Sequence, residues 1–139
     1  MTAAGLRRAL LTALVLLALG GLLLHLRAHP VFLADKAHPG ATLFRPAFIA
    51  ASLLPLLDLL LVTALFSSRR TAVYGYLLNG LIVIYGSVFM AHFSIAALFA
   101  PQGPAFADWV LRTTFPDIAI AWGDFFVGKA LYDSWTREV

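Results

Sequence analysis

Residues 73–100 read VYGYLLNGLIVIYGSVFMAHFSIAALFA, an apolar stretch that contains no Asp, Glu, Lys or Arg. A helix that crosses the hydrocarbon core of a bilayer needs about 20 predominantly apolar residues. The stretch therefore predicts a membrane-spanning helix. It is longer than a perpendicular helix requires, so we expect this helix to tilt or to protrude from the bilayer.

Three further apolar stretches are close to membrane-spanning length, and they cover residues 9–26, 47–66 and 117–132. Together with residues 73–100 and the connections between the stretches, they use nearly all of the 139 residues, so we expect the chain to form one domain. We predict an all-α integral membrane protein whose four transmembrane helices form an antiparallel bundle. The first stretch exceeds the apolar region of a signal peptide and lacks a small-residue cleavage pattern, so we expect it to be retained as an anchor.

The segments between these stretches predict three kinds of connection. Residues 27–46 hold three prolines, which oppose a continuous helix and predict an irregular polar loop. Residues 67–71 predict a short turn, which makes the second and third helices an antiparallel hairpin. Residues 105–114, with Trp109 beside charged side chains, predict a short helix that lies at the membrane interface before the last span.

The composition fits a membrane protein and excludes several kinds of chemistry. Hydrophobic residues make up 61% of the chain and charged residues 12%, about half of the charged fraction usual in soluble domains. The absence of cysteine excludes disulfides and thiolate nucleophiles, so metal ligands would have to be His, Asp, Glu or backbone oxygens. The net charge is +3, but no basic cluster is interleaved with aromatic residues, so we do not expect a nucleic-acid partner.

The distribution of Lys and Arg predicts the orientation, because cytoplasmic loops carry an excess of both. With a cytoplasmic N-terminus, the inner set is Arg7, Arg8, Arg69, Arg70, Lys129 and Arg137. The outer set is then Arg27, Lys36, Arg45 and Arg112. This bias predicts both termini on the cytoplasmic side, and we expect the membrane to be a bacterial inner membrane.

Asp58 falls near the centre of the second span. A bare aspartate at that depth costs at least about 2.5 to 3.5 kcal/mol on insertion scales. It must face protein, water or a partner, or hold a proton. One hypothesis is a hydrogen bond to Asn79 on the neighbouring helix, and the other is a role as a proton carrier.

A second group of polar residues falls in the third and fourth spans. At a rise of 1.5 Å per residue, His92 and Asp124 lie about 12 Å and 10 Å below the outer ends of their helices, so the two are level. Tyr85 shares a helical stripe with His92. A Tyr85, His92 and Asp124 cluster would serve as a structural pair, a proton or quinone site, or part of a metal or haem site.

Histidines elsewhere allow two metal hypotheses. His25 and His92 are the only residues able to hold a b-type haem from two spans, and their depths differ by about 10 Å, which suits opposite axial ligands poorly. The first outer loop offers His29, His38 and Asp35, with His25 at its start, as ligands for copper or zinc. Neither hypothesis assigns a cofactor.

Small residues mark the expected helix contacts. Gly75, Asn79 and Gly86 lie on one face of the third helix, and Gly128 lies beside the stripe that holds Asp124 in the fourth. Small residues let helix backbones approach closely in a membrane. We therefore expect Gly75, Gly86 and Gly128 to be packing positions.

The sequence contains no nucleotide-binding or hydrolase motif. Its features support three hypotheses of function. The first is a small accessory subunit of a larger inner-membrane complex of the energy-transducing or transport type, packing against partner helices, lipid or pigment, with no catalysis of its own. The second is a homo-oligomeric transporter, channel or proton pathway that uses Asp58, His92 and Asp124. The third is a redox, lipid- or quinone-handling subunit.

Overall fold

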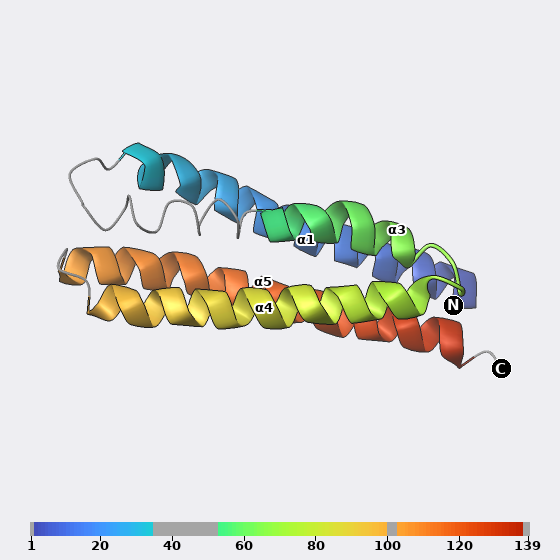
Figure 1. The fold of residues 1–139 in the computed structure, drawn as a ribbon. Coiled ribbons are helices and arrows are strands. Elements are labelled where there is room, and N and C mark those ends of the chain that lie inside the picture. The colour runs from blue at the N-terminus through green and yellow to red at the C-terminus, as the bar shows by residue number, and fades with distance from the viewer. Residues whose placement is uncertain (1, 35–52, 100–102, 138–139) are drawn as a thin grey trace.

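The computed structural model describes residues 2–34, 53–99 and 103–137, and the described residues form helices and turns without a strand. The helices are α1 (Ala3–Ala34), a helix over Leu53–Leu65 that ends in α3 (Thr63–Leu65), α4 (Ala72–Leu98) and α5 (Pro104–Thr136). The prediction of an all-α fold is confirmed. Figure 1 shows the helices side by side, with both termini at the same end.

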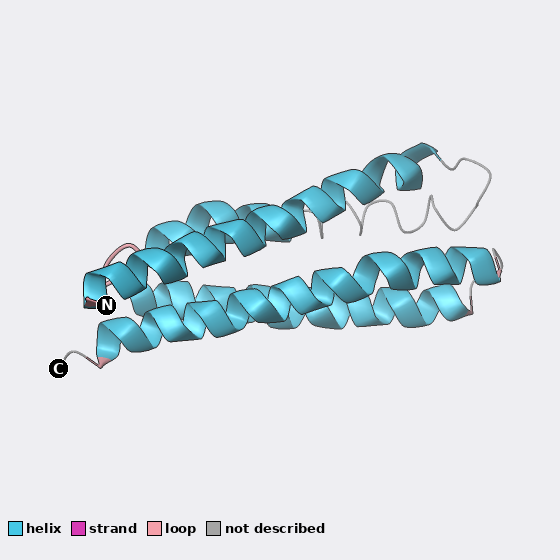
Figure 2. Ribbon diagram, turned by 180° about the vertical axis from the view of Figure 1, so that it is seen from behind, coloured by secondary structure: helices cyan, strands magenta, loops and turns pink. Residues whose placement is uncertain are grey.

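The four helical segments form a ring in which sequence neighbours pack together. Helix α5 packs against α4 and against α1, and the Leu53–Leu65 helix packs against α1 and α4. Consequently α1 lies diagonally opposite α4, and the Leu53–Leu65 helix lies diagonally opposite α5. Figure 2 shows the same arrangement from behind. Side chains from diagonal helices can meet only at the bundle axis.

Two of the helices are long and apolar enough to cross a membrane. They cover Ala3–Leu26, with a mean hydropathy of 2.4, and Ala72–Leu98, with a mean hydropathy of 2.0. The second agrees closely with the predicted span over 73–100. The Leu53–Leu65 helix is apolar but shorter, and residues 47–52 of the predicted second span lie outside the described residues.

The predicted interfacial helix over 105–114 is wrong, because α5 runs without a break from Pro104 to Thr136. Pro116 lies inside this helix and removes one backbone donor, yet one lost hydrogen bond does not break the helix. The Thr114 and Ser94 hydroxyls lie 2.7 Å apart and join α5 to α4 next to Pro116. A continuous α5 therefore packs along the full length of α4.

The predicted loop over 27–46 is also wrong in part. Helix α1 continues to Ala34, so its last residues are helical rather than irregular. Pro30 lies within one turn of the helix end, where its missing donor costs a single hydrogen bond. Residues 35–46 of the predicted loop lie outside the described residues.

An apolar core closes the bundle at the end that holds the termini. It is formed by buried side chains from every helical segment, namely Leu14, Val62, Phe66, Ala72 and Leu131. The indole N–H of Trp135 donates to the Phe66 carbonyl at 3.1 Å, which ties the end of α5 to the turn before α4. We call these five side chains the apolar seal.

Candidate functional site

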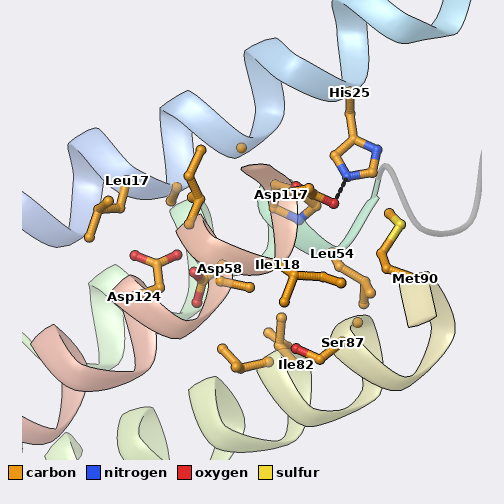
Figure 3. Close-up of a pocket in the computed structure, with 17 residues that line it drawn as sticks. Leu17, His25, Leu54, Asp58, Ile82, Ser87, Met90, Asp117, Ile118 and Asp124 are labelled. Atoms are coloured by element: carbon orange, nitrogen blue, oxygen red, sulfur yellow. Dashed lines mark hydrogen bonds and ion pairs between the residues drawn. The ribbon is translucent and has the colours of Figure 1, made fainter. Parts of the chain in front are cut away.

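The bundle interior contains a cavity of about 50 Å³ that receives side chains from all four helical segments. Most of its lining is aliphatic, but five polar residues contribute, and Figure 3 labels each of them: His25, Asp58, Ser87, Asp117 and Asp124. Roughly 10–15 Å³ of cavity volume is enough to hold one water molecule. The cavity therefore has the size and the polarity to take up a few waters.

Asp58 reaches the axis from a distorted turn of its helix. It begins a π-helical segment, η1 (Asp58–Val62), whose hydrogen bonds skip one more residue than those of an α-helix. The Thr63 N–H donates to the Asp58 carbonyl, and the Thr63 hydroxyl donates to the same oxygen at 3.4 Å. Pro55, one turn earlier, also lines the cavity. The Asp58 side chain is 3% exposed.

The hydrogen bond that the sequence allowed between Asp58 and Asn79 is present. The Asn79 side-chain amide donates from Nδ2 to Asp58 Oδ1 at 3.3 Å. Asn79 is fully buried, and the space for it exists because α5 carries glycine at position 128. A Cβ atom at Gly128 would lie 3.3 Å from the Asn79 amide.

Asp124 lies next to Asp58 on the diagonally opposite helix. The two carboxyl groups interact directly, and Figure 3 shows both at the cavity. Asp124 is 4% exposed, and its Oδ1 makes no hydrogen bond within the described residues. Two acidic groups therefore face each other in an apolar bundle, and the described residues supply them with one amide donor, Asn79, which is bound to Asp58.

A second polar contact lies in the same cavity, farther from the termini. His25 Nε2 of α1 lies 2.8 Å from Asp117 Oδ2 of α5, and both side chains are largely buried. The Ser87 hydroxyl of α4 also lines the cavity, and it is buried without a hydrogen-bond partner in the described part of the chain. The polar lining thus extends from the Asp58–Asp124 pair to the His25–Asp117 pair.

The predicted cluster of Tyr85, His92 and Asp124 is not brought together. Tyr85 is 66% exposed and His92 is also exposed, so both lie on the outside of α4. Neither lines the cavity that contains Asp124. The residues had matching depths, but depth along a helix does not determine which way a side chain faces.

The described residues do not bring together the ligands of the haem hypothesis, and they form no metal site. His25 points into the interior and is bound to Asp117, whereas His92 is exposed on the diagonally opposite helix, so the two do not form an axial pair. Within the described ranges, no group of three His, Asp or Glu side chains could hold a metal ion. The side chain of His29 and the whole of Asp35 and His38 lie outside the described residues.

The predicted packing glycines lie at helix contacts. A Cβ at Gly75 would meet Leu65 at 3.2 Å and Phe66 at 3.3 Å, and a Cβ at Gly86 would meet Leu54 at 3.6 Å. Gly75 and Gly86 therefore face the helix that precedes α4 and the turn that follows that helix. Gly128 provides the corresponding space between α5 and α4.

The sequence reasoning missed the pairing of His25 with Asp117 and the burial of Ser87. A signal for the pairing was available, because His25 ends the first predicted span and Asp117 begins the last, so both fall at the same end of the bundle. Asp117 also precedes Asp124 by seven residues, which places both on one helical stripe. No corresponding signal distinguishes Ser87 from other small residues of α4.

Comparisons with protein-family models, with curated proteins and with solved structures found no match to this chain.

Proposed function

We propose that this protein is a four-helix integral membrane protein that takes up and releases a proton at the Asp58–Asp124 pair. It would do so within a transport or energy-transducing assembly of the bacterial inner membrane, with both termini on the cytoplasmic side. The observation that carries the proposal is the contact between two buried carboxyl groups at the axis of an apolar bundle.

The charge balance at the pair is the first argument. Two ionised carboxylates in contact repel each other, and an apolar interior does little to screen them. The described residues around the pair supply one amide donor and no cation within hydrogen-bonding distance. The pair is therefore expected to hold a proton, as adjacent carboxyl groups in other proteins do.

A route for that proton is the second argument. The cavity extends from Asp124 to His25 and Asp117, and its volume suits a few water molecules. An imidazole that contacts a carboxylate can pass on a proton by changing its protonated nitrogen. In the proposed mechanism, water and the His25–Asp117 pair connect the acidic pair with the end of the bundle opposite the termini.

The apolar seal makes this route one-sided. Leu14, Val62 and Leu131 each lie closer to the terminal end of their helix than the polar residues of the cavity do. A carboxyl group that is reached from one side only would bind and release its proton on that side. Transfer across the membrane would then require a partner or a change in the helix packing at the seal.

Infrared spectroscopy tests the proposal without a partner protein. We expect wild-type protein in lipid at neutral pH to show the C=O band of a protonated carboxyl group, and we expect the band to shift when H₂O is exchanged for D₂O. The band should change in frequency or intensity in Asp58→Asn and in Asp124→Asn, and it should disappear only in the double variant, because a single carboxyl group left in an apolar interior still favours its protonated form. The band should persist unchanged in Asp108→Asn, a control at an exposed acid paired with Arg112.

Two results would overturn the proposal. One is the absence of a protonated carboxyl band, which would mean that both aspartates are ionised. The other is a band that belongs to the pair but does not respond to D₂O over hours, which would mean a permanently buried structural proton. His25→Gln should slow the D₂O response without removing the band, because it changes the route rather than the pair.

The second candidate function is an accessory subunit that packs against partner helices, lipid or pigment. It is favoured by hydrogen bonds between helices, such as Asn79 to Asp58 and Ser94 to Thr114, which in membranes contribute about 0.6 to 2 kcal/mol each. In this role the aspartates only hold the bundle together. Asp124→Asn would then lower the unfolding temperature and leave the activity per folded complex intact, whereas the proton-exchange role predicts normal assembly and lost activity.

A further inference from the structure

A second cavity lies at the terminal end of the bundle, on the far side of the apolar seal from the acidic pair. Its volume is about 240 Å³, and it lies between the start of α1, the turn after Phe66 and the end of α5. Basic and polar side chains line one part of it, and apolar side chains line the rest. The full lining is Ala4, Arg7, Arg8, Leu11, Phe66, Ser67, Leu131 and Trp135.

Arg7 is held in place at this cavity. Its Nη2 donates to the Ser134 carbonyl at 2.9 Å, and its guanidinium carbon lies 4.0 Å from the centre of the Trp135 ring. Trp135 is itself fixed by its hydrogen bond to the Phe66 carbonyl. A guanidinium that is already ordered loses less conformational freedom when it binds an anion.

Among the described residues, basic side chains outnumber acidic ones around the cavity. Arg8, Arg69 and Arg70 are exposed at this end and make no ion pair within the described residues. The one described acid nearby, Asp133, is already bound by Lys129 at 2.8 Å and Arg137 at 3.0 Å. The hydrogen bond from Lys129 in particular lowers the pKa of Asp133, so its charge is compensated on its own helix.

We propose that this cavity binds a phosphate-bearing anion, and specifically the headgroup of an anionic phospholipid. Arg8 and the ordered Arg7 would contact the phosphate, and Leu11 and Leu131 would contact the start of an acyl chain. Basic pockets between membrane helices on the cytoplasmic side are suited to such headgroups. The inference does not depend on the acidic pair, which lies beyond the apolar seal.

Native mass spectrometry of the delipidated full chain tests this inference, with phosphatidylglycerol, phosphatidylcholine or inorganic phosphate added. We expect phosphatidylglycerol to bind more tightly than phosphatidylcholine and to raise the unfolding temperature. Arg8→Gln should weaken phosphatidylglycerol binding about fivefold, since one basic residue near an anionic lipid contributes about 1 kcal/mol. Arg112→Gln, which removes an arginine that is also exposed but lies at the other end of the bundle, should leave binding unchanged.

Inorganic phosphate separates the two sources of the anion. If inorganic phosphate does not displace phosphatidylglycerol, the site recognises the whole lipid. If inorganic phosphate displaces the lipid from wild type but not from Arg8→Gln, the site recognises the phosphate group itself. Equal binding of the two lipids would overturn the proposal. An equal loss of binding in Arg8→Gln and Arg112→Gln would also overturn it, because the attraction would then be a general effect of charge.

Discussion

Asp58, Asn79, Asp124 and Gly128 form a group in which each residue depends on the others. Asn79 supplies the amide donor to Asp58, Gly128 supplies the space for Asn79, and Asp124 lies against Asp58 from the opposite side. All four are buried, and in a bundle this apolar an unsatisfied polar atom costs about 1 to 3 kcal/mol. Substitutions here should therefore have larger effects than their change in volume suggests.

Gly128→Ala should lower the free energy of unfolding by about 1 to 3 kcal/mol, because its methyl group would press on the buried Asn79 amide at 3.3 Å. Thermal unfolding in detergent measures the effect. The matched control is Gly123→Ala in the same helix, where the methyl group would meet the flexible end of Leu17 at 3.6 Å. We expect the control to be neutral or stabilising, since alanine is a better helix former than glycine. Equal unfolding temperatures for the two variants would contradict the contact.

Asn79→Leu should destabilise the protein by about 1 to 3 kcal/mol, because Asp58 would lose the donor that now lies 3.3 Å away. The double variant Asn79→Leu with Asp58→Leu should recover part of this loss, since it removes the donor and the acceptor of this hydrogen bond together. A double-mutant cycle on unfolding free energies measures the coupling. Strictly additive effects would show that the two side chains do not interact.

Two helices each contain a local irregularity. The π-helical segment Asp58–Val62 presents both of its end residues to the interior, since Asp58 is 3% exposed and Val62 is fully buried. Leu60, between them, is 61% exposed. Helix α5 contains an internal proline and nevertheless continues as one helix. In both cases packing against neighbouring helices outweighs a local irregularity.

Pro116→Ala should stabilise α5, because alanine restores the backbone donor that proline lacks and removes its clash with the Arg112 carbonyl, a gain of up to about 3 kcal/mol. Thermal unfolding together with helicity by circular dichroism measures the effect. Pro104→Ala is the matched control, because Pro104 begins the same helix at a position that favours proline. A loss of stability in Pro116→Ala would indicate a kink that the fold requires at this position.

The whole molecule combines a sealed end and a polar interior. The apolar seal and the basic cavity lie at the end with the termini, whereas the acidic pair and the His25–Asp117 contact lie on the other side of the seal. Each proposal therefore belongs to a different part of the bundle. In the proposed membrane-spanning arrangement, the orientation of the bundle determines which compartment each part faces.

Cysteine labelling tests that orientation, and the natural chain contains no cysteine that would react. Ala3→Cys and Ala105→Cys change the same residue type at exposed positions at opposite ends of the bundle. We expect an impermeant maleimide added to intact cells to label Ala105→Cys and not Ala3→Cys, since the arginine-rich end should be cytoplasmic. Labelling of Ala3→Cys alone would reverse the orientation, and labelling of neither without cell lysis would contradict a spanning bundle.

The sequence by itself determined the helical class and several local relations. The apolar run over 73–100 corresponds to α4, because a stretch of that length and composition without charges buries its backbone only as a helix. The short turn over 67–71 made α4 antiparallel to the helix before it. Asp58 and Asn79 could be matched because that turn sets the register of the two helices.

Only the tertiary structure decided which polar residues share the interior. Spacing along one helix relates its own side chains, but the rotation of one helix against another depends on packing over their whole surfaces. That rotation turns His92 outward and brings Asp124 to Asp58 and Asp117 to His25. The continuity of α5 through Pro116 was decided in the same way, because its contact with α4 outweighs one missing hydrogen bond.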